Sequence, residues 1–117
     1  MFDLEFEAQD LEYSAEWRRE KAKQYPEDWR NIAAAELLDK IAMEVRAMEG
    51  SEIHCQISAA INERLDAKGD FGSFFEEWSD YKRRIGFWEF PSGKEYLSDM
   101  LKGMLKYWHH VSEEIAD

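Results

Sequence analysis

Hydrophobic residues recur at intervals of three and four along most of this chain, and this spacing restricts what it can fold into. The longest such stretch would put five residues on one face of a helix: Ala34, Leu37, Ile41, Val45 and Met48. Turn-forming residues fall between the periodic stretches, where helices would have to end. The pattern predicts an all-α protein, a small bundle of four to five helices.

Capping residues give the expected boundaries of these helices. Ser14 is a candidate N-cap for a first helix that ends near Gln24, and Pro26 suits the first position of a second helix because its missing N–H would be unpaired there. Gly50 stands where the second helix needs a left-handed cap. Further helices are expected over residues 51–69, 70–86 and 92–117, with capping residues at positions 51, 70 and 92.

The amino terminus departs from the helical spacing. Hydrophobic and acidic residues alternate there, in the order Phe2, Asp3, Leu4, Glu5, Phe6 and Glu7. Alternation at period two is typical of a strand, and a strand without a partner in its own chain must fray, pack on the helices or pair with another chain. We therefore expect an extended acidic arm over residues 1–13, dispensable for folding, and a single helical domain over residues 14–117.

The negative charge of the chain is concentrated at its two ends. Residues 1–16 carry six acids and no base, and residues 113–117 carry three further acids, which leaves minus 2 of the net charge of −11 for everything between. This balance argues against direct binding to nucleic acid, because neutralising phosphates needs clustered Lys and Arg. The expected partner is a protein, either a different one or a second copy of the chain as a homodimer.

The sequence also favours a cytoplasmic location. Cys55 is the single cysteine, so no internal disulfide can form, whereas small secreted domains usually need several. No stretch approaches the roughly 20 apolar residues of a membrane span, and the first residues lack the apolar run of a signal peptide. We expect no association with a membrane.

The reactive residues do not form a catalytic motif. Residues 70–72 spell the metal-binding tripeptide Asp-Phe-Gly of protein kinases, but the other kinase motifs are missing. His54 and Cys55 are adjacent, and adjacent side chains on a helix diverge. His109 and His110 each have a glutamate four residues later, which would give two metal ligands, too few for a zinc site. We therefore assign no catalytic residue, no cofactor and no metal ligand.

One set of carboxylates resembles a known enzyme signature. Glu49 and Glu52 are followed, after a gap of 24 residues, by Glu77 and Asp80. This arrangement is similar to the acidic signature of the all-α nucleoside triphosphate pyrophosphohydrolases, the MazG-like family, in which such pairs hold magnesium. The resemblance covers these four positions and implies a magnesium-dependent hydrolase. Residues 50–51 interrupt the first pair at an expected helix boundary, so that its two carboxylates would not project together.

A second candidate binding element is the connection that contains Phe87, Trp88 and Phe90. Three large aromatic residues in a short connection either close the end of a bundle or act as a binding anchor. Trp88, which precedes Glu89, is the one that we expect to face solvent. The predicted partner-binding residues are Phe2, Asp3, Leu4, Glu5, Phe6, Glu7 and Trp88.

Three functions from different classes follow from these observations. The first is a small acidic helical module for protein interaction or regulation, without catalytic activity. The second is an acidic mimic of nucleic acid that inhibits a DNA- or RNA-handling protein, because Asp3, Glu5 and Glu7 on an extended chain would be about 6–7 Å apart, as phosphates are. The third is the magnesium-dependent pyrophosphohydrolase.

Overall fold

The computed structural model describes residues 2–65, 72–84 and 92–116, which contain five α-helices and no strand. The helices are α1 (Leu4–Gln24), α2 (Arg30–Arg46), α3 (Glu52–Leu65), α4 (Gly72–Arg84) and α5 (Gly93–Ala116). The prediction of an all-α helical bundle is therefore confirmed.

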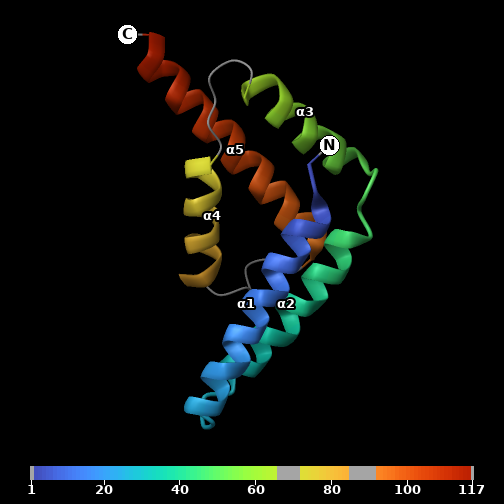
Figure 1. The fold of residues 1–117 in the computed structure, drawn as a ribbon, viewed down its shortest axis with the longest axis vertical. Helices are drawn as coiled ribbons and strands as arrows, with labels where there is room; N and C mark the ends of the chain where they lie inside the picture. The colour runs from blue at the N-terminus through green and yellow to red at the C-terminus, as the bar shows by residue number, and fades with distance from the viewer. Residues whose placement is uncertain (1, 66–71, 85–91, 117) are drawn as a thin grey trace.

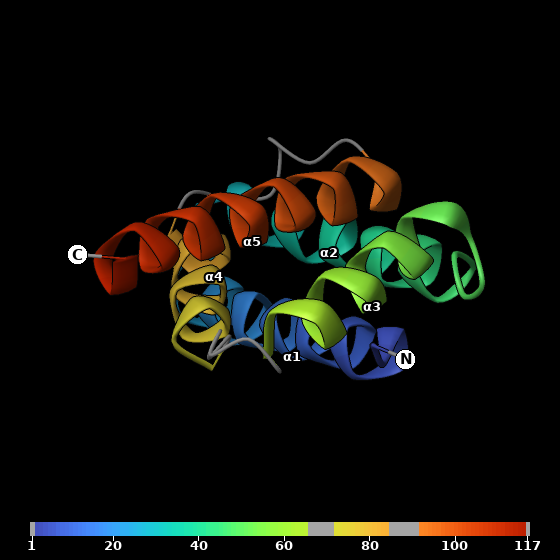
Figure 2. The same cartoon turned by 90° about the horizontal axis from the view of Figure 1, so that it is seen from above.

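The longest feature of the molecule is a hairpin formed by α1 and α2, which lie side by side (Figure 1). Its far end, with the α1–α2 connection, extends well beyond α3, α4 and α5, and the molecule is elongated, with extents of 52 × 32 × 19 Å. Seen from above, α5 lies on the opposite side of the molecule from α1 (Figure 2). The far end of the hairpin therefore lies beyond the other described helices.

The predicted extended arm over residues 1–13 is wrong, because α1 begins at Leu4. Asp3 caps this helix: its carboxylate accepts hydrogen bonds from the backbone nitrogens of Glu5 at 3.0 Å and Phe6 at 3.3 Å. The buried residues of α1 recur at helical spacing and are Leu4, Glu7, Ala8, Leu11, Ser14 and Ala15. A helix satisfies its own backbone hydrogen bonds, whereas a lone strand would leave them unpaired.

Two further predicted boundaries are wrong. Ser14 lies inside α1, where its hydroxyl donates to the carbonyl of Asp10 at 3.1 Å, and so it caps no helix. Pro26 lies in the connection before α2, which begins at Arg30. The carboxylate of Asp28 accepts the backbone N–H of Arg30 at 3.1 Å. The connection is therefore longer than the sequence pattern predicts.

The predicted serine caps at Ser51 and Ser92 are confirmed, and position 70 lies outside the described residues. Gly50 has the predicted left-handed backbone angle, with φ of 79°, but it does not cap α2, which ends at Arg46 with Ala47 as its C-cap. The hydroxyl of Ser51 accepts the backbone N–H of His54 at 3.3 Å, at the start of α3. The hydroxyl of Ser92 likewise accepts the backbone N–H of Glu95 at 3.2 Å, at the start of α5. Serine caps thus fix two of the helix starts.

Small residues line the contact between α1 and α2. Five alanines are at most 1% exposed there: Ala8, Ala15, Ala34, Ala35 and Ala42. Their size lets the two helices approach closely along the whole hairpin. Leu11, Leu38 and Ile41 are fully buried and fill the remaining space. Each large side chain buried in this way contributes about 1.5–3 kcal/mol to stability.

α5 contacts the carboxyl-terminal half of α2 through an unusually close approach at Gly93. A β-carbon at this position would lie 2.7 Å from the β-carbon of Glu44 and 3.0 Å from the backbone nitrogen of Val45. The backbone nitrogen of Gly93 also donates to the carboxylate of Glu44 at 2.6 Å. This contact fixes the position at which α5 starts on α2.

We expect Gly93→Ala to lower the free energy of unfolding by about 1–3 kcal/mol, because the new methyl group would force the two backbones apart. Gly103→Ala in the same helix is the matched control. A β-carbon there would meet only the ring of Phe74, at 3.2 Å, and the alanine favours the helix. Urea denaturation compares the two variants, and equal midpoints would contradict the proposed close packing at Gly93.

Candidate interaction surface

Large hydrophobic side chains are exposed on the hairpin much more than on the rest of the described chain. Among the residues whose side chains are described, eight large hydrophobic ones are exposed, and seven of these belong to α1, α2 or their connection. The seven are Phe6, Tyr13, Trp17, Tyr25, Trp29, Ile32 and Met43, whereas the eighth, Leu105, lies on α5. Large hydrophobic side chains that are exposed next to one another mark interaction surfaces, whereas single scattered ones are normal.

Three of these residues form an aromatic stripe on α1, consisting of Phe6, Tyr13 and Trp17. Spacings of seven and four residues put them on one face of a helix with about 3.6 residues per turn, opposite the buried face. Their exposed fractions are 68%, 69% and 46%. The guanidinium of Arg18 and the ammonium of Lys21 lie 5.2 and 5.4 Å from the centre of the Trp17 ring. These distances allow cation–π attraction.

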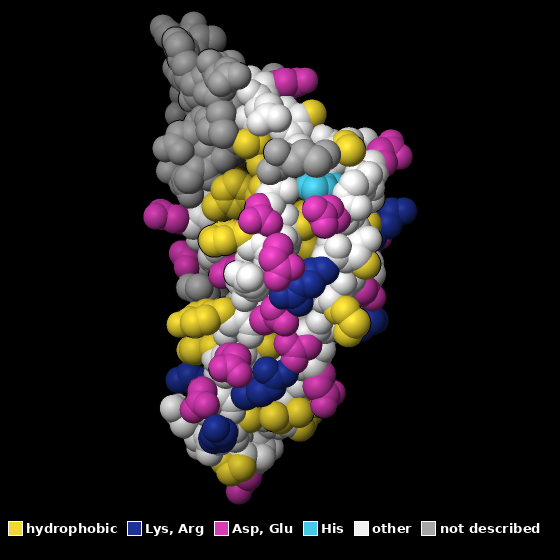
Figure 3. Space-filling view, turned by 45° about the vertical axis from the view of Figure 1, so that its right-hand side comes forward, with side chains coloured by type: hydrophobic (Ala, Val, Ile, Leu, Met, Phe, Trp, Pro, Cys, Tyr) yellow, Lys and Arg dark blue, Asp and Glu magenta, His cyan; other side chains and the backbone are white. Residues whose placement is uncertain are grey.

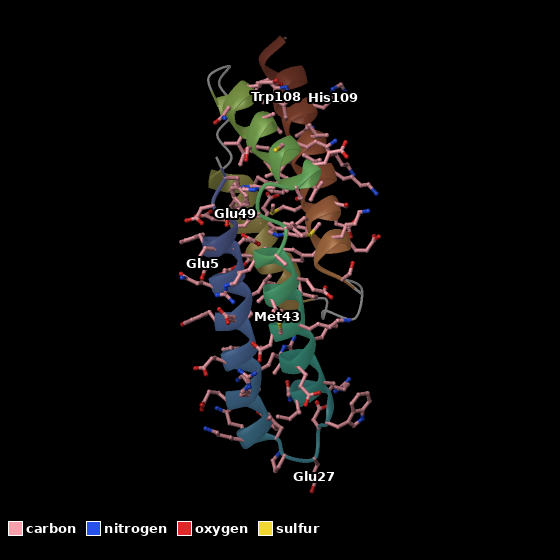
Figure 4. The ribbon with its side chains drawn as sticks, turned by 90° about the vertical axis from the view of Figure 1, so that its right-hand side faces the viewer. Glu5, Glu27, Met43, Glu49, Trp108 and His109 are labelled. Carbon is pink, nitrogen blue, oxygen red and sulfur yellow. The ribbon has the colours of Figure 1, made fainter. Side chains whose placement is uncertain are left out.

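The other exposed hydrophobic residues lie at the tip of the hairpin and on the outer face of α2. Figure 4 shows Glu27 at the far end of the hairpin and Met43 part of the way along α2. Trp29 is 74% exposed, the largest fraction among these side chains. A hollow of about 590 Å³ at the tip is lined by residues 24–30.

Ion pairs join α1 to α2 between these hydrophobic residues. The guanidinium of Arg46 donates to the carboxylate of Glu5 at 2.7 and 2.9 Å and to that of Glu12 at 2.5 Å. These hydrogen bonds lower the pKa of both carboxyl groups and raise the pKa of Arg46. Arg19 forms a second ion pair, with Asp39. Figure 3 shows acidic and basic side chains interleaved over this part of the molecule, with hydrophobic ones beside them.

The predicted partner-binding apolar residues do not share one surface. Phe2 packs inward, where its ring stacks on Phe75 with the ring centres 5.8 Å apart, and Leu4 is only 3% exposed. Phe6 alone faces solvent. The predicted common face of the three is therefore wrong, because the helix turns each of them to a different side. Trp88 lies outside the described residues, together with Phe87 and Phe90.

The three predicted acids of this segment have three separate roles. Asp3 caps α1, Glu5 pairs with Arg46, and Glu7 is buried. Their expected phosphate-like spacing required an extended chain, and α1 includes both glutamates. The extended chain on which that spacing depended is therefore not present.

Glu7 belongs to a buried polar network that the sequence pattern did not reveal. The hydroxyl of Tyr96 donates to the carboxylate of Glu7, and the indole nitrogen of Trp78 donates to the Tyr96 oxygen at 3.0 Å. Burial raises the pKa of Tyr96, and the negative charge of Glu7 raises it further. The network joins α1, α4 and α5. The sequence did contain a signal for the burial of Glu7. It lies three residues after Leu4 and four before Leu11, which is the spacing of one helix face.

A second buried polar cluster holds the amino-terminal backbone against α3. The backbone nitrogen of Gly50 donates to Nδ1 of His54 at 2.9 Å, so Nε2 carries the proton and donates to the carbonyl of Phe2 at 2.6 Å. The backbone nitrogen of Phe2 donates to the hydroxyl of Ser58 at 2.9 Å. His54 is 2% exposed. These bonds give His54 a structural role as a link between α3 and the start of α1.

The carboxylates of the pyrophosphohydrolase-like signature do not converge. Glu49 lies in the turn before α3, near the start of α1 (Figure 4), and Glu52 lies in the first turn of α3. Glu77 and Asp80 are exposed on α4. Within residues 2–65, 72–84 and 92–116, no group of three or more His, Cys, Asp or Glu side chains is arranged to hold a metal ion.

Comparison with known proteins assigns no family. No family model matches the chain, and neither a curated protein nor a solved structure is significantly similar to it. None of the helices in the described residues combines the length and the apolar character needed to cross a membrane.

Proposed function

We propose that this protein is a small acidic interaction module whose contact surface is the α1–α2 hairpin. The observation that carries the proposal is the distribution of exposed large hydrophobic residues, seven of eight on the hairpin among the side chains described. Five of the seven are phenylalanine, tyrosine or tryptophan. Tyrosine and tryptophan are the residues that most often dominate binding energy at protein interfaces.

The construction of the hairpin supports this proposal. Its two helices pack through fully buried alanines and are tied together by the Arg46 and Arg19 ion pairs. The surface is therefore presented on paired helices, which restricts its motion before a partner binds and reduces the entropic cost of binding. The nucleic-acid mimic and the pyrophosphohydrolase remain alternatives, without a contact among the described residues that favours either.

A photo-crosslinking experiment tests the proposal. A photoreactive phenylalanine replaces Trp29 or Met43 on the hairpin in one pair of variants, and Leu105 on α5 in the control, and all three are expressed in the natural host. We expect the hairpin variants to form a discrete protein adduct that the Leu105 variant does not form. The adduct at Met43 should weaken when Tyr25 and Trp29 are both replaced by serine. Equal crosslinking from α5 and the hairpin would overturn the proposal.

A further inference from the structure

The ion pairs between α1 and α2 lie on a side of the hairpin that is open to solvent. Each helix contributes one row of residues to this side, and within a row the spacing is four and three residues, so each row follows one face of its helix. None of these residues is buried. Together they form the seam face, which consists of Glu5, Gln9, Glu12, Glu16 and Arg19 of α1 and Ile32, Glu36, Asp39, Met43 and Arg46 of α2.

The two rows of the seam face lie side by side because two arginines join them. Arg46 of α2 donates to the carboxylates of Glu5 and Glu12 of α1. Arg19 of α1 pairs with Asp39 of α2. Acidic side chains gather around the basic ones on this part of the molecule (Figure 3). The seam face is therefore one continuous surface along the hairpin.

The seam face keeps an excess of negative charge after its own ion pairs are counted. It contains five acids and two arginines, which leaves a charge of minus 3. Arg46 serves two glutamates at once. Glu16 and Glu36 form no ion pair with any residue that the structure describes. The surplus is thus carried by carboxylates that have no cation of their own.

The other bases of the hairpin do not offset this charge. Lys23, Arg30 and Lys40 are each paired with an acid outside the seam face. Arg18 and Lys21 lie beside the aromatic stripe, over the ring of Trp17. A partner that approaches the seam face therefore meets a negative potential.

Two of the exposed hydrophobic residues belong to the seam face. Ile32 is 47% exposed and Met43 is 68% exposed. They belong to the same row of α2 and are separated by three turns of helix, or about 16 Å. A segment that matches this face must offer apolar side chains at about this separation, with positive charges beside them.

We propose that the seam face binds a basic amphipathic helix of another protein. Lys or Arg side chains of that helix pair with the surplus carboxylates, and its apolar side chains cover Ile32 and Met43. An amphipathic helix laid against an exposed helical surface is a recurring mode of recognition. The inference rests on the proposed function and names the kind of partner that the hairpin binds.

The charge of the seam face argues against the other occupants. A two-fold contact uses the same surface on both subunits, so a second copy would bring together two faces that each carry minus 3. An acidic segment would be repelled in the same way. An uncharged apolar segment would cover Glu16 and Glu36 without giving either carboxylate a partner. Only a basic segment gains from both the charges and the hydrophobic groups.

Titration of the full chain with two labelled helical peptides tests the proposal, with fluorescence anisotropy as the readout. One peptide consists of lysine, leucine and alanine, and the other has glutamate at every lysine position. We expect the chain to bind the lysine peptide, with an affinity that falls as salt is added, and not to bind the glutamate peptide. Equal binding of both peptides, or of neither, would overturn the proposal.

Paired charge reversals locate the contact. Glu16→Lys/Glu36→Lys should weaken binding of the lysine peptide about tenfold, because two attractions become two repulsions. Glu63→Lys/Glu77→Lys makes the same change in net charge at exposed positions of α3 and α4. This control should weaken binding by less than about twofold, since salt screens distant charges. Equal losses in the two double variants would indicate attraction by net charge alone and contradict a contact at the seam face.

A second pair of variants tests the apolar part of the contact. Met43→Ser should weaken binding of the lysine peptide about fivefold, because an apolar contact is lost. Leu105→Ser on α5 removes an exposed hydrophobic group from a different surface and should have no effect. A peptide of lysine and alanine without leucine should also bind more weakly. Undiminished binding to Met43→Ser, or of the peptide without leucine, would rule out an amphipathic partner.

Failure of this inference is distinguishable from failure of the proposed function. A discrete photo-crosslinked adduct at Met43, together with no preference for the lysine peptide over the glutamate peptide, would leave the proposed function intact and overturn this inference. Equal crosslinking from α5 and the hairpin would instead overturn the proposed function.

Discussion

Deletion of residues 2–12 should unfold the protein. The deletion removes Leu4, Ala8 and Leu11, which are at most 3% exposed, together with the buried carboxylate of Glu7. Loss of a buried leucine costs about 2–5 kcal/mol, and a domain of this size has a total stability of about 5–15 kcal/mol. Far-UV circular dichroism and urea denaturation measure the result. A truncated chain with a cooperative transition near that of the full chain would contradict the packing of α1.

Two single substitutions test whether the loss of stability comes from the buried residues of α1 and not from altering this segment in general. Leu4→Ala should lower the free energy of unfolding by about 2–5 kcal/mol because Leu4 is in the core. Phe6→Ala removes a larger side chain only two residues away but should change stability by less than about 0.5 kcal/mol, because Phe6 is exposed. An extended arm with Leu4 and Phe6 on one face would give similar effects at both positions.

Tyr96→Phe should lower the free energy of unfolding by about 3–5 kcal/mol although it removes a single oxygen atom. The Tyr96 hydroxyl donates to the buried carboxylate of Glu7 and accepts from the indole of Trp78. Without it, the buried carboxylate of Glu7 loses the Tyr96 donor and the indole N–H of Trp78 loses the Tyr96 acceptor, and removing one partner of a buried charge costs several kcal/mol. Urea denaturation of the wild type and the variant measures the difference.

The exposed Tyr13 provides the matched control, since Tyr13→Phe removes a hydroxyl from solvent and should be nearly neutral. The double variant Glu7→Leu/Tyr96→Phe removes the charge together with its donor. Because it removes the carboxylate together with the Tyr96 hydroxyl that donates to it, it should lose less stability than the sum of the two single changes. Strictly additive effects would show that Glu7 and Tyr96 do not act together.

The same network predicts a loss of stability at alkaline pH. The pKa of Tyr96 is raised well above 10.0 in the folded protein. Between about pH 10, the ordinary value for tyrosine, and the higher folded pKa, the unfolded chain releases a proton that the folded chain retains. Stability from this group is therefore complete below pH 10 and falls as pH rises, by up to about 1.4 kcal/mol per pH unit. Tyr96→Phe should lack this component of the pH dependence.

Much of the helical framework could be predicted from local sequence. The serine caps at Ser51 and Ser92 and the left-handed Gly50 were correctly predicted, because a cap depends on a few neighbouring residues and on their backbone angles. The buried face of α2 was predicted in the same way, since Ala34, Ile41 and Val45 keep helical spacing. Signals of this kind require no knowledge of the rest of the fold.

In the first helix, the local alternation of hydrophobic residues was not enough to predict the secondary structure. Residues 2–7 alternate as a strand would, yet the wider sequence also contains a helical stripe of Leu4, Ala8, Leu11 and Ala15. Two periodicities overlap in one short segment. The helix is formed because Asp3 caps it and α2 covers its alanine-rich face, which is a tertiary contact that spacing alone does not specify.

The sequence by itself determined the all-α class, the serine caps, the conformation of Gly50 and the overall charge, because these depend on composition and on residues adjacent in the chain. Only the tertiary structure decided that Glu7 lies in the core, that Tyr96 binds it, and that Phe6 faces solvent while Leu4 does not. Tyr96 comes from α5, and Trp78, which donates to Tyr96, comes from α4, so both lie far from Glu7 along the chain. Which face of a helix is exposed depends on the elements that pack against it, and the candidate interaction surface is the hairpin face that none of the described helices covers.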